Sequence, residues 1–176
     1  MKILFAALLF LVSSAPGCAR AGEAPPVDKP AATEKTVTFK NTEGLETGTA
    51  MITGTPNGVL FRLDLQNLPP GEHAFHIHEH GVCDPAAKFD SAGAHYNPES
   101  DQHGYHAEEG PHEGDMPNLT ILPDGTLNAE VFNEEAELDE LVADDGAALM
   151  IHEKTDDYRT QPSGNAGGRI ACAVVK

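Results

Sequence analysis

The chain has 176 residues, of which 28 are acidic and 11 are basic, so its formal charge at pH 7 is −17. This length suits one domain with a tail. The surplus of negative charge argues against a nucleic acid partner, because proteins bind the phosphate backbone mainly through lysine and arginine.

The first residues have the features of an export signal. Lys2 precedes an apolar run over residues 3–12, and small residues follow. The run is too short to span a membrane as a helix, so we interpret residues 1–17 as a signal peptide. We therefore expect an exported protein.

Two cleavage sites compete. APGC at residues 15–18 resembles a bacterial lipoprotein box, which would make Cys18 the lipidated first residue, whereas ARA at residues 19–21 would release a soluble protein. The cysteine count favours lipidation, because Cys83 and Cys172 then remain as an even pair in an oxidising compartment. We therefore expect a location in the bacterial periplasm or cell envelope, with a lipid anchor to a membrane.

A tether precedes the folded domain. Residues 18–34 are rich in proline, alanine and charge and have no apolar period, which is typical of a flexible linker. From residue 35 to residue 176 the pattern changes to short strands separated by turns, which places the domain there.

Seven or eight strands are expected in this domain, and a sustained helical period is almost absent. They lie in TVTFK, GTAMIT, VLFRLDL, FHIH, NLTILPDGTLNAEVF, ALMIH and RIACAVV. The fifth of these segments is expected to be a hairpin that turns at residues 123–125, and a short helix near residues 134–141 is weakly indicated. Strands at this spacing predict an all-β antiparallel sandwich or barrel.

The strand at residues 75–78 carries two histidines on one face. Because side chains alternate along a strand, Phe75 and Ile77 can enter the core while His76 and His78 point together to the other side. This pair could bind one metal ion, but two surface histidines on an edge strand would give the same pattern.

Two polar segments, residues 83–117 and 153–168, are too long for ordinary connections, and such loops are usually functional or disordered. The candidate metal ligands of the first segment are His95, His103, His112 and Asp115. Three nitrogens and one oxygen suit tetrahedral Zn(II), which would help the loop to fold. A solvated histidine-rich loop is the alternative.

The order and spacing of several motifs closely resemble the copper,zinc superoxide dismutase family in its bacterial secreted form. These motifs are GEHAFHIHE, GVC, SAGAHYNP, HGYHAEEGPHEGD, IHEKTDDY and GNAGGRIAC, and the resemblance covers residues 36–176. It implies an eight-stranded antiparallel Greek-key barrel, an immunoglobulin-like sandwich, with two long functional loops.

The resemblance also implies the metal ligands. Copper, cycling between Cu(II) and Cu(I), would be bound by His76, His78, His95 and His152, and zinc by His95, His103, His112 and Asp115. His95 would then bridge the two metals as an imidazolate. Asp156 resembles the family carboxylate that links a copper-ligand histidine to a zinc-ligand histidine.

The same resemblance assigns a disulfide and an active-site arginine. Cys83 and Cys172 match the family disulfide, which should stabilise the fold by several kcal/mol, on the order of 4 in the chain-entropy model. Arg169 matches the active-site arginine. His80 and His106 match no ligand position.

The implied activity is dismutation of superoxide to O2 and hydrogen peroxide, with Arg169 and His95 catalytic, in defence of the cell envelope. The acidic segment at residues 133–145 puts the efficiency of electrostatic steering in doubt. A copper-handling protein and a zinc hydrolase are the rival hypotheses, and either a monomer or a homodimer fits the sequence.

Overall fold

A computed structural model describes residues 33–176. The expected signal peptide, Cys18 and nearly all of the expected tether lie outside the described residues. Within the described part, none of the helices combines the length and the apolar character that crossing a membrane requires.

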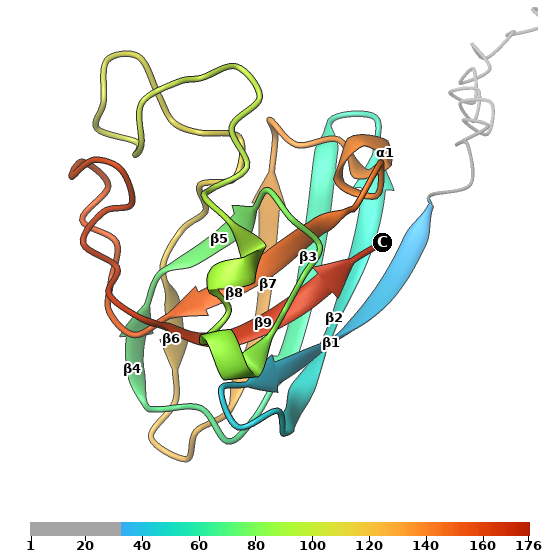
Figure 1. The fold of residues 1–176 in the computed structure, drawn as a ribbon, viewed down its shortest axis with the longest axis vertical. Coiled ribbons are helices and arrows are strands. Elements are labelled where there is room, and N and C mark those ends of the chain that lie inside the picture. Colours follow the sequence, from blue (N-terminus) through green and yellow to red (C-terminus); the bar gives the residue numbers. More distant parts are fainter. Residues whose placement is uncertain (1–32) are drawn as a thin grey trace, which may run out of the picture. The chain divides into compact units, whose positions relative to one another are not determined.

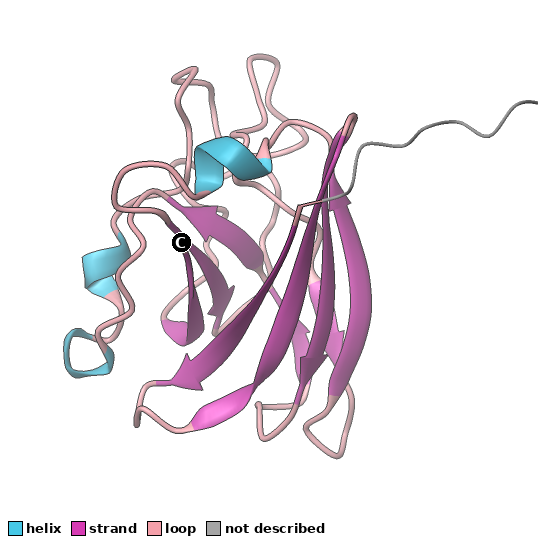
Figure 2. Ribbon diagram, turned by 90° about the vertical axis from the view of Figure 1, so that its right-hand side faces the viewer, coloured by secondary structure: helices cyan, strands magenta, loops and turns pink. Residues whose placement is uncertain are grey.

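Residues 33–176 form nine antiparallel strands, which confirms the predicted all-β fold (Figures 1 and 2). Seven strands make one strongly curled sheet in the order β5-β8-β9-β1-β2-β3-β7, and β4 pairs with β6. The strands are β1 (Glu34–Asn41), β2 (Glu46–Thr55), β3 (Gly58–Leu65), β4 (Gly71–His73), β5 (Phe75–His78), β6 (Leu119–Ile121), β7 (Leu127–Asn133), β8 (Ala147–His152) and β9 (Arg169–Val175). One helical turn, α1 (Leu138–Leu141), and two short 3-10 turns, Pro85–Ala87 and Asp90–Ala92, complete the fold.

The ninth strand is β4, which the sequence does not predict, and Ala74 separates it from β5. The Ala74 N–H donates to the carbonyl of Lys154, and the His152 N–H donates to the carbonyl of Ala74. β4 therefore pairs with β6 on one side of this residue, while β5 pairs with β8 on the other. Residues 71–78 therefore contribute one strand to each of the two sheets, with Ala74 between them.

The expected hairpin at residues 118–132 is only partly present. The chain turns at residues 123–125 as predicted, and the Asp124 carboxylate accepts hydrogen bonds from the N–H and hydroxyl of Thr126. Beyond the turn, however, β6 pairs with β4 and β7 pairs with β3. The turn thus connects two sheets instead of two strands of one hairpin.

The alternation of apolar and polar residues in VLFRLDL, which is typical of a strand with one buried face, is confirmed in β3. Its inward residues Val59, Phe61, Leu63 and Leu65 are buried in the core. β5 differs from that pattern, because all four of its residues are buried. Its apolar side chains enter the core as expected, but His76 and His78 are covered on the other side by loops.

The predicted disulfide between Cys83 and Cys172 is present, with the Cα atoms 5.8 Å apart. It joins the start of the long loop that follows β5 to strand β9. Phe89, Ala92, Ala148 and Met150 pack around it in a second, smaller apolar cluster. The disulfide therefore ties the loop to the sheet on the side away from the main core.

Replacing both cysteines by serine should lower the free energy of unfolding by about 4 to 5 kcal/mol, because the closed loop of 89 residues then gains freedom in the unfolded chain. Chemical denaturation of the metal-free protein, oxidised and as the double variant, measures this difference. Equal midpoints with equal slopes would contradict the prediction.

Candidate metal centre

The open edge of the sheet positions the candidate site. β5 is the edge strand, and the long loop (residues 79–118) pairs with it: the Ile77 N–H donates to the carbonyl of Gly114, and the Tyr96 N–H donates to the carbonyl of Ile77. Two isolated bridges follow, between His76 and Asp115 and between His78 and His95. The histidines of the strand are thereby brought beside those of the loop.

Four buried histidines form the first ligand group: His76, His78, His95 and His152. One ring nitrogen of each lies within 4.8 Å of the others. His76 Nδ1 and His95 Nε2 are buried without a hydrogen-bond partner, and the Nε2 atoms of His78 and His152 are only 3.3 Å apart. Buried nitrogens left unpaired and facing one another are what a bound metal ion would satisfy.

The remaining nitrogens orient two of these rings. Nε2 of His76 donates to the Asp156 carboxylate at 2.9 Å, and Nδ1 of His78 donates to the carbonyl of Gly93 at 3.0 Å. The other nitrogen of each ring therefore presents a lone pair. Burial lowers the pKa of His76, His78 and His152, which favours the neutral form that binds metal.

The second group has the dimensions of a tetrahedral zinc site. The Nδ1 atoms of His95, His103 and His112 lie 2.8, 3.0 and 3.4 Å from Asp115 Oδ1. Ligand atoms at about 2.0 Å from one zinc ion are about 3.3 Å apart in a tetrahedron. Asp115 Oδ2 accepts hydrogen bonds from the main-chain N–H groups of Gly104 and His112, which leaves Oδ1 for the metal.

His95 belongs to both groups. Its Nδ1 faces Asp115, while its unpaired Nε2 faces the copper-type group. The donor sets thus fit copper and zinc with one imidazole between them, because nitrogen ligands suit copper and an N3O set suits zinc.

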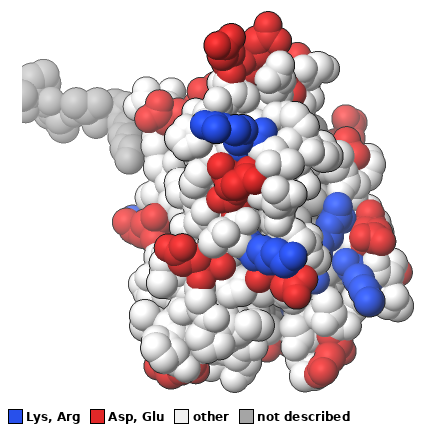
Figure 3. Space-filling model, turned by 90° about the vertical axis from the view of Figure 1, so that its left-hand side faces the viewer, with Lys and Arg blue, Asp and Glu red and all other residues white. Residues whose placement is uncertain are grey.

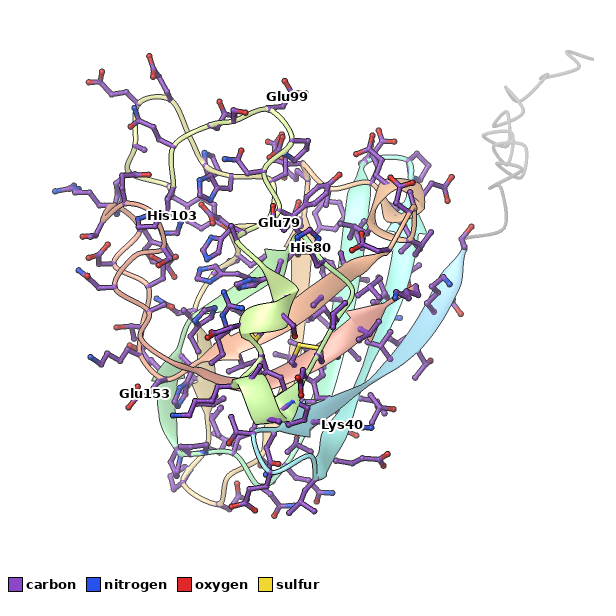
Figure 4. The ribbon with its side chains drawn as sticks, viewed as in Figure 1. Lys40, Glu79, His80, Glu99, His103 and Glu153 are labelled. Carbon is purple, nitrogen blue, oxygen red and sulfur yellow. A yellow bond between two sulfur atoms is a disulfide. The ribbon has the colours of Figure 1, made fainter. Side chains whose placement is uncertain are left out.

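Asp156 links the two groups. Its Oδ2 accepts from Nε2 of His76 at 2.9 Å, and its Oδ1 accepts from Nε2 of His103 at 3.0 Å. Gly164, at φ +64°, packs directly on this link, where a Cβ atom would overlap Asp156 Oδ1. His103, in the long loop, faces the second loop (residues 153–168), as Figure 4 shows.

The two carboxylates determine the charge of the metal-free site. Burial lowers the pKa of His103, but the hydrogen bonds to Asp115 and Asp156 outweigh this effect and raise it to about 9. Burial alone would raise the pKa of Asp115 and Asp156, yet their histidine partners hold both pKa values well below the usual range. Burial also lowers the pKa of His95 to about 4.

Arg169 lies beside the first group. Its Nη1 and Nη2 donate to the carbonyls of Phe89 and Gly93, each at 2.5 Å. The Gly93 carbonyl also accepts the bond from His78, so the arginine and this histidine share one anchor. The roles of this carbonyl and of Gly164 could not be predicted from the sequence, because both lie in loops without a periodic pattern.

The other histidines lie outside both groups, as expected for His80 and His106. His80 is exposed and pairs with Asp145 at 3.3 Å (Figure 4). His106 packs edge-on against Tyr158. The ring nitrogens of buried His73 lie 2.7 and 3.0 Å from main-chain carbonyl oxygens, which gives it a structural role.

Comparison with known proteins places these groups in a family. Residues 46–175 match the family described as copper/zinc superoxide dismutase (SODC). Among curated relatives, the Cu-Zn superoxide dismutase 2 of Aquifex aeolicus is 45% identical over 142 residues, which cover 77% of this chain and 82% of the relative.

Solved structures agree with the sequence match. A SOD-like protein from Bacillus subtilis has a TM-score of 0.76 at 35% identity, covering 80% of this chain and 97% of that one. The Cu/Zn superoxide dismutase of Brucella abortus has a TM-score of 0.69 at 31% identity, covering 82% and 100% of the two chains. The chain belongs to the copper/zinc superoxide dismutase family.

Proposed function

We propose that this protein dismutates superoxide to O2 and hydrogen peroxide. Copper would be held by His76, His78, His95 and His152, and zinc by His95, His103, His112 and Asp115. The observation that carries the proposal is the shared position of His95 between two complete, buried ligand groups. Bound copper would supply the one-electron oxidation and reduction of two superoxide ions.

Arg169 is proposed to hold the anionic substrate. Its guanidinium is permanently charged, and two carbonyl anchors fix its plane next to the first histidine group. The remaining N–H donors of such a fork can bind an anion by charge-assisted hydrogen bonds. His95 is proposed to hold a proton at Nε2 between the two halves of the reaction and to give it to the reduced oxygen species.

The net negative charge does not form an unbroken barrier to an anion. On the side of the molecule that carries the second loop, basic side chains lie among the acidic ones (Figure 3). Because salt screens charges beyond about 8 to 10 Å, this local field matters more to superoxide than the total charge.

The alternative is a protein that handles metal without dismutase activity, because the similar fold from Bacillus subtilis is described only as SOD-like. A protein that only stores or delivers copper has no need of a second, complete zinc group or of an anchored arginine. Both features are present here, which favours the enzyme.

We also propose that the protein is exported and acts in the periplasm or cell envelope, anchored through a lipidated Cys18. The lipoprotein-like box at residues 15–18 and the bacterial relatives support this location. The disulfide agrees with an oxidising compartment.

Arg169→Ala should slow superoxide consumption by the copper- and zinc-loaded protein about tenfold to a hundredfold, the effect of losing charge-assisted hydrogen bonds of about 1.5 to 3 kcal/mol. Pulse radiolysis measures the rate. Arg62→Ala is the matched control, because Arg62 pairs with Glu130 on the surface of the sheet. Equal rates for both variants would remove Arg169 from the mechanism, and a loaded wild type no faster than buffer would refute the dismutase proposal.

His95→Ala should abolish most of the activity and weaken zinc binding, because it removes a ligand from both groups at once. His80→Ala, which changes an exposed histidine, should retain both metals and full activity. Elemental analysis after dialysis, together with the activity, tests the pair. Full zinc content in His95→Ala would contradict the shared ligand.

Zinc binding should release a proton from His103 at pH 7, because its pKa of about 9 keeps both ring nitrogens protonated in the metal-free protein. The apparent zinc affinity should therefore rise with pH up to about 9 and then level off. Calorimetry in buffers of different ionisation enthalpy gives the number of protons released. A zinc affinity independent of pH between 6 and 8 would contradict this assignment.

A further inference from the structure

The link between His103 and Asp156 is made by two side chains whose main chains lie in loops, outside any strand. Both residues are buried, with Asp156 3% exposed and His103 fully covered. A sheet would satisfy and hold their main-chain N–H and carbonyl groups, but neither belongs to one. Something else must fix these two main chains if the side chains are to meet at 3.0 Å.

Two side-chain amides do so in the same reciprocal way. Asn118 Oδ1 accepts from the Asp156 N–H at 2.8 Å, and Asn118 Nδ2 donates to the Asp156 carbonyl at 3.0 Å. Gln161 Oε1 accepts from the His103 N–H at 2.9 Å, and Gln161 Nε2 donates to the His103 carbonyl at 2.9 Å. Within residues 33–176 these amides are the partners of all four main-chain groups.

We call each reciprocal pair of hydrogen bonds a clamp. The two clamps connect the same two loops, but the amide comes from a different loop in each. Asn118 ends the long loop and holds Asp156 in the second loop, whereas Gln161 lies in the second loop and holds His103 in the long loop. Tyr158 reinforces the first clamp: its hydroxyl accepts from the Asn118 N–H at 2.7 Å, and its N–H donates to Asp156 Oδ1 at 2.7 Å. Each end of the His103–Asp156 hydrogen bond is therefore held from the opposite loop.

We propose that Asn118 and Gln161 are positioning residues, whose amides grip the main chains of Asp156 and His103 and thereby control how firmly the second histidine group retains zinc. The inference rests on the proposed metal site. Partners of ligating histidines fix ring orientation, and their loss typically lowers metal affinity about 10- to 100-fold. Here the effect reaches the metal through a main chain, without contact between either amide and a ligand nitrogen.

The test uses isosteric changes in the full copper- and zinc-loaded protein. Asn118→Asp and Gln161→Glu each keep one acceptor but replace the NH2 donor by an oxygen that faces a carbonyl, so the clamp opens at one end. The measured quantity is the rate of zinc transfer to a chromogenic chelator. Each variant should lose zinc at least about tenfold faster than the wild type.

The chain offers a matched control for each change. Asn97 makes the same reciprocal pair of hydrogen bonds, at 2.9 and 3.0 Å, with the main chain of Asp101 in the same long loop. Gln102 adjoins His103, and its amide donates only to Glu109. Asn97→Asp and Gln102→Glu add the same charge without touching the link, so their zinc loss should stay within about twofold of the wild type.

A second readout separates positioning from general stabilisation. Asp156 also binds His76, so Asn118→Asp should change the Cu(II) electron paramagnetic resonance spectrum, whereas its control should not. In an Asp156→Ala background, Asn118→Asp should not further accelerate zinc loss, because the carboxylate that Asn118 positions is gone. If Asn118→Asp does not fold, Asn118→Ser, which removes the carboxamide without adding charge, is measured with the same expectation.

The outcomes are distinct. Clamp variants that melt at lower temperature but release zinc at the rate of their controls would overturn this proposal, because their role would be only structural. Further acceleration by Asn118→Asp in the Asp156→Ala background would also overturn it. A wild type that retains no zinc would instead refute the proposed metal site itself.

Discussion

The structure depends on one constraint: imidazoles and carboxylates that belong to the site are buried outside the hydrophobic core, where each unpaired polar atom is costly. Asp115 and Asp156 provide hydrogen-bond partners for most of these buried polar atoms. Each accepts hydrogen bonds from more than one histidine, and their depressed pKa values keep them ionised. Two nitrogens of their histidine partners remain unpaired, His76 Nδ1 and His95 Nε2. Both belong to the first ligand group and indicate where a metal ion would bind.

The candidate metal centre is built on an edge of the curled sheet and not in a cavity inside it. β5 is the last strand of the curled sheet, and its open side would be free to pair with another chain. The long loop uses that edge, through Ile77, to place His95 and Asp115 against His76 and His78. One covering segment thus protects the edge and completes the ligand groups.

The features predicted from the sequence alone are those that a local residue pattern determines. Alternation in β3 and the same-face placement of His76 and His78 follow from the two-residue period of a strand. The ligand set and the disulfide came from motif resemblance, because no periodicity connects residues 78 and 152. The break at Ala74, the Gly93 carbonyl and the amides of Asn118 and Gln161 were missed, since each acts through contacts with a distant loop that the local sequence does not encode.

The disulfide and the arginine belong to one arrangement. Arg169 and Cys172 lie on β9, while the carbonyls that anchor Arg169 lie at Phe89 and Gly93, in the segment that Cys83 begins. The covalent bond and the two hydrogen bonds therefore join the same pair of segments at successive points. Because the Gly93 carbonyl also orients His78, any movement of this segment away from β9 would displace the guanidinium and a proposed copper ligand together. The position of the anion-binding group relative to the metal is in this way fixed by the strand that carries it and by the loop that the disulfide holds to that strand.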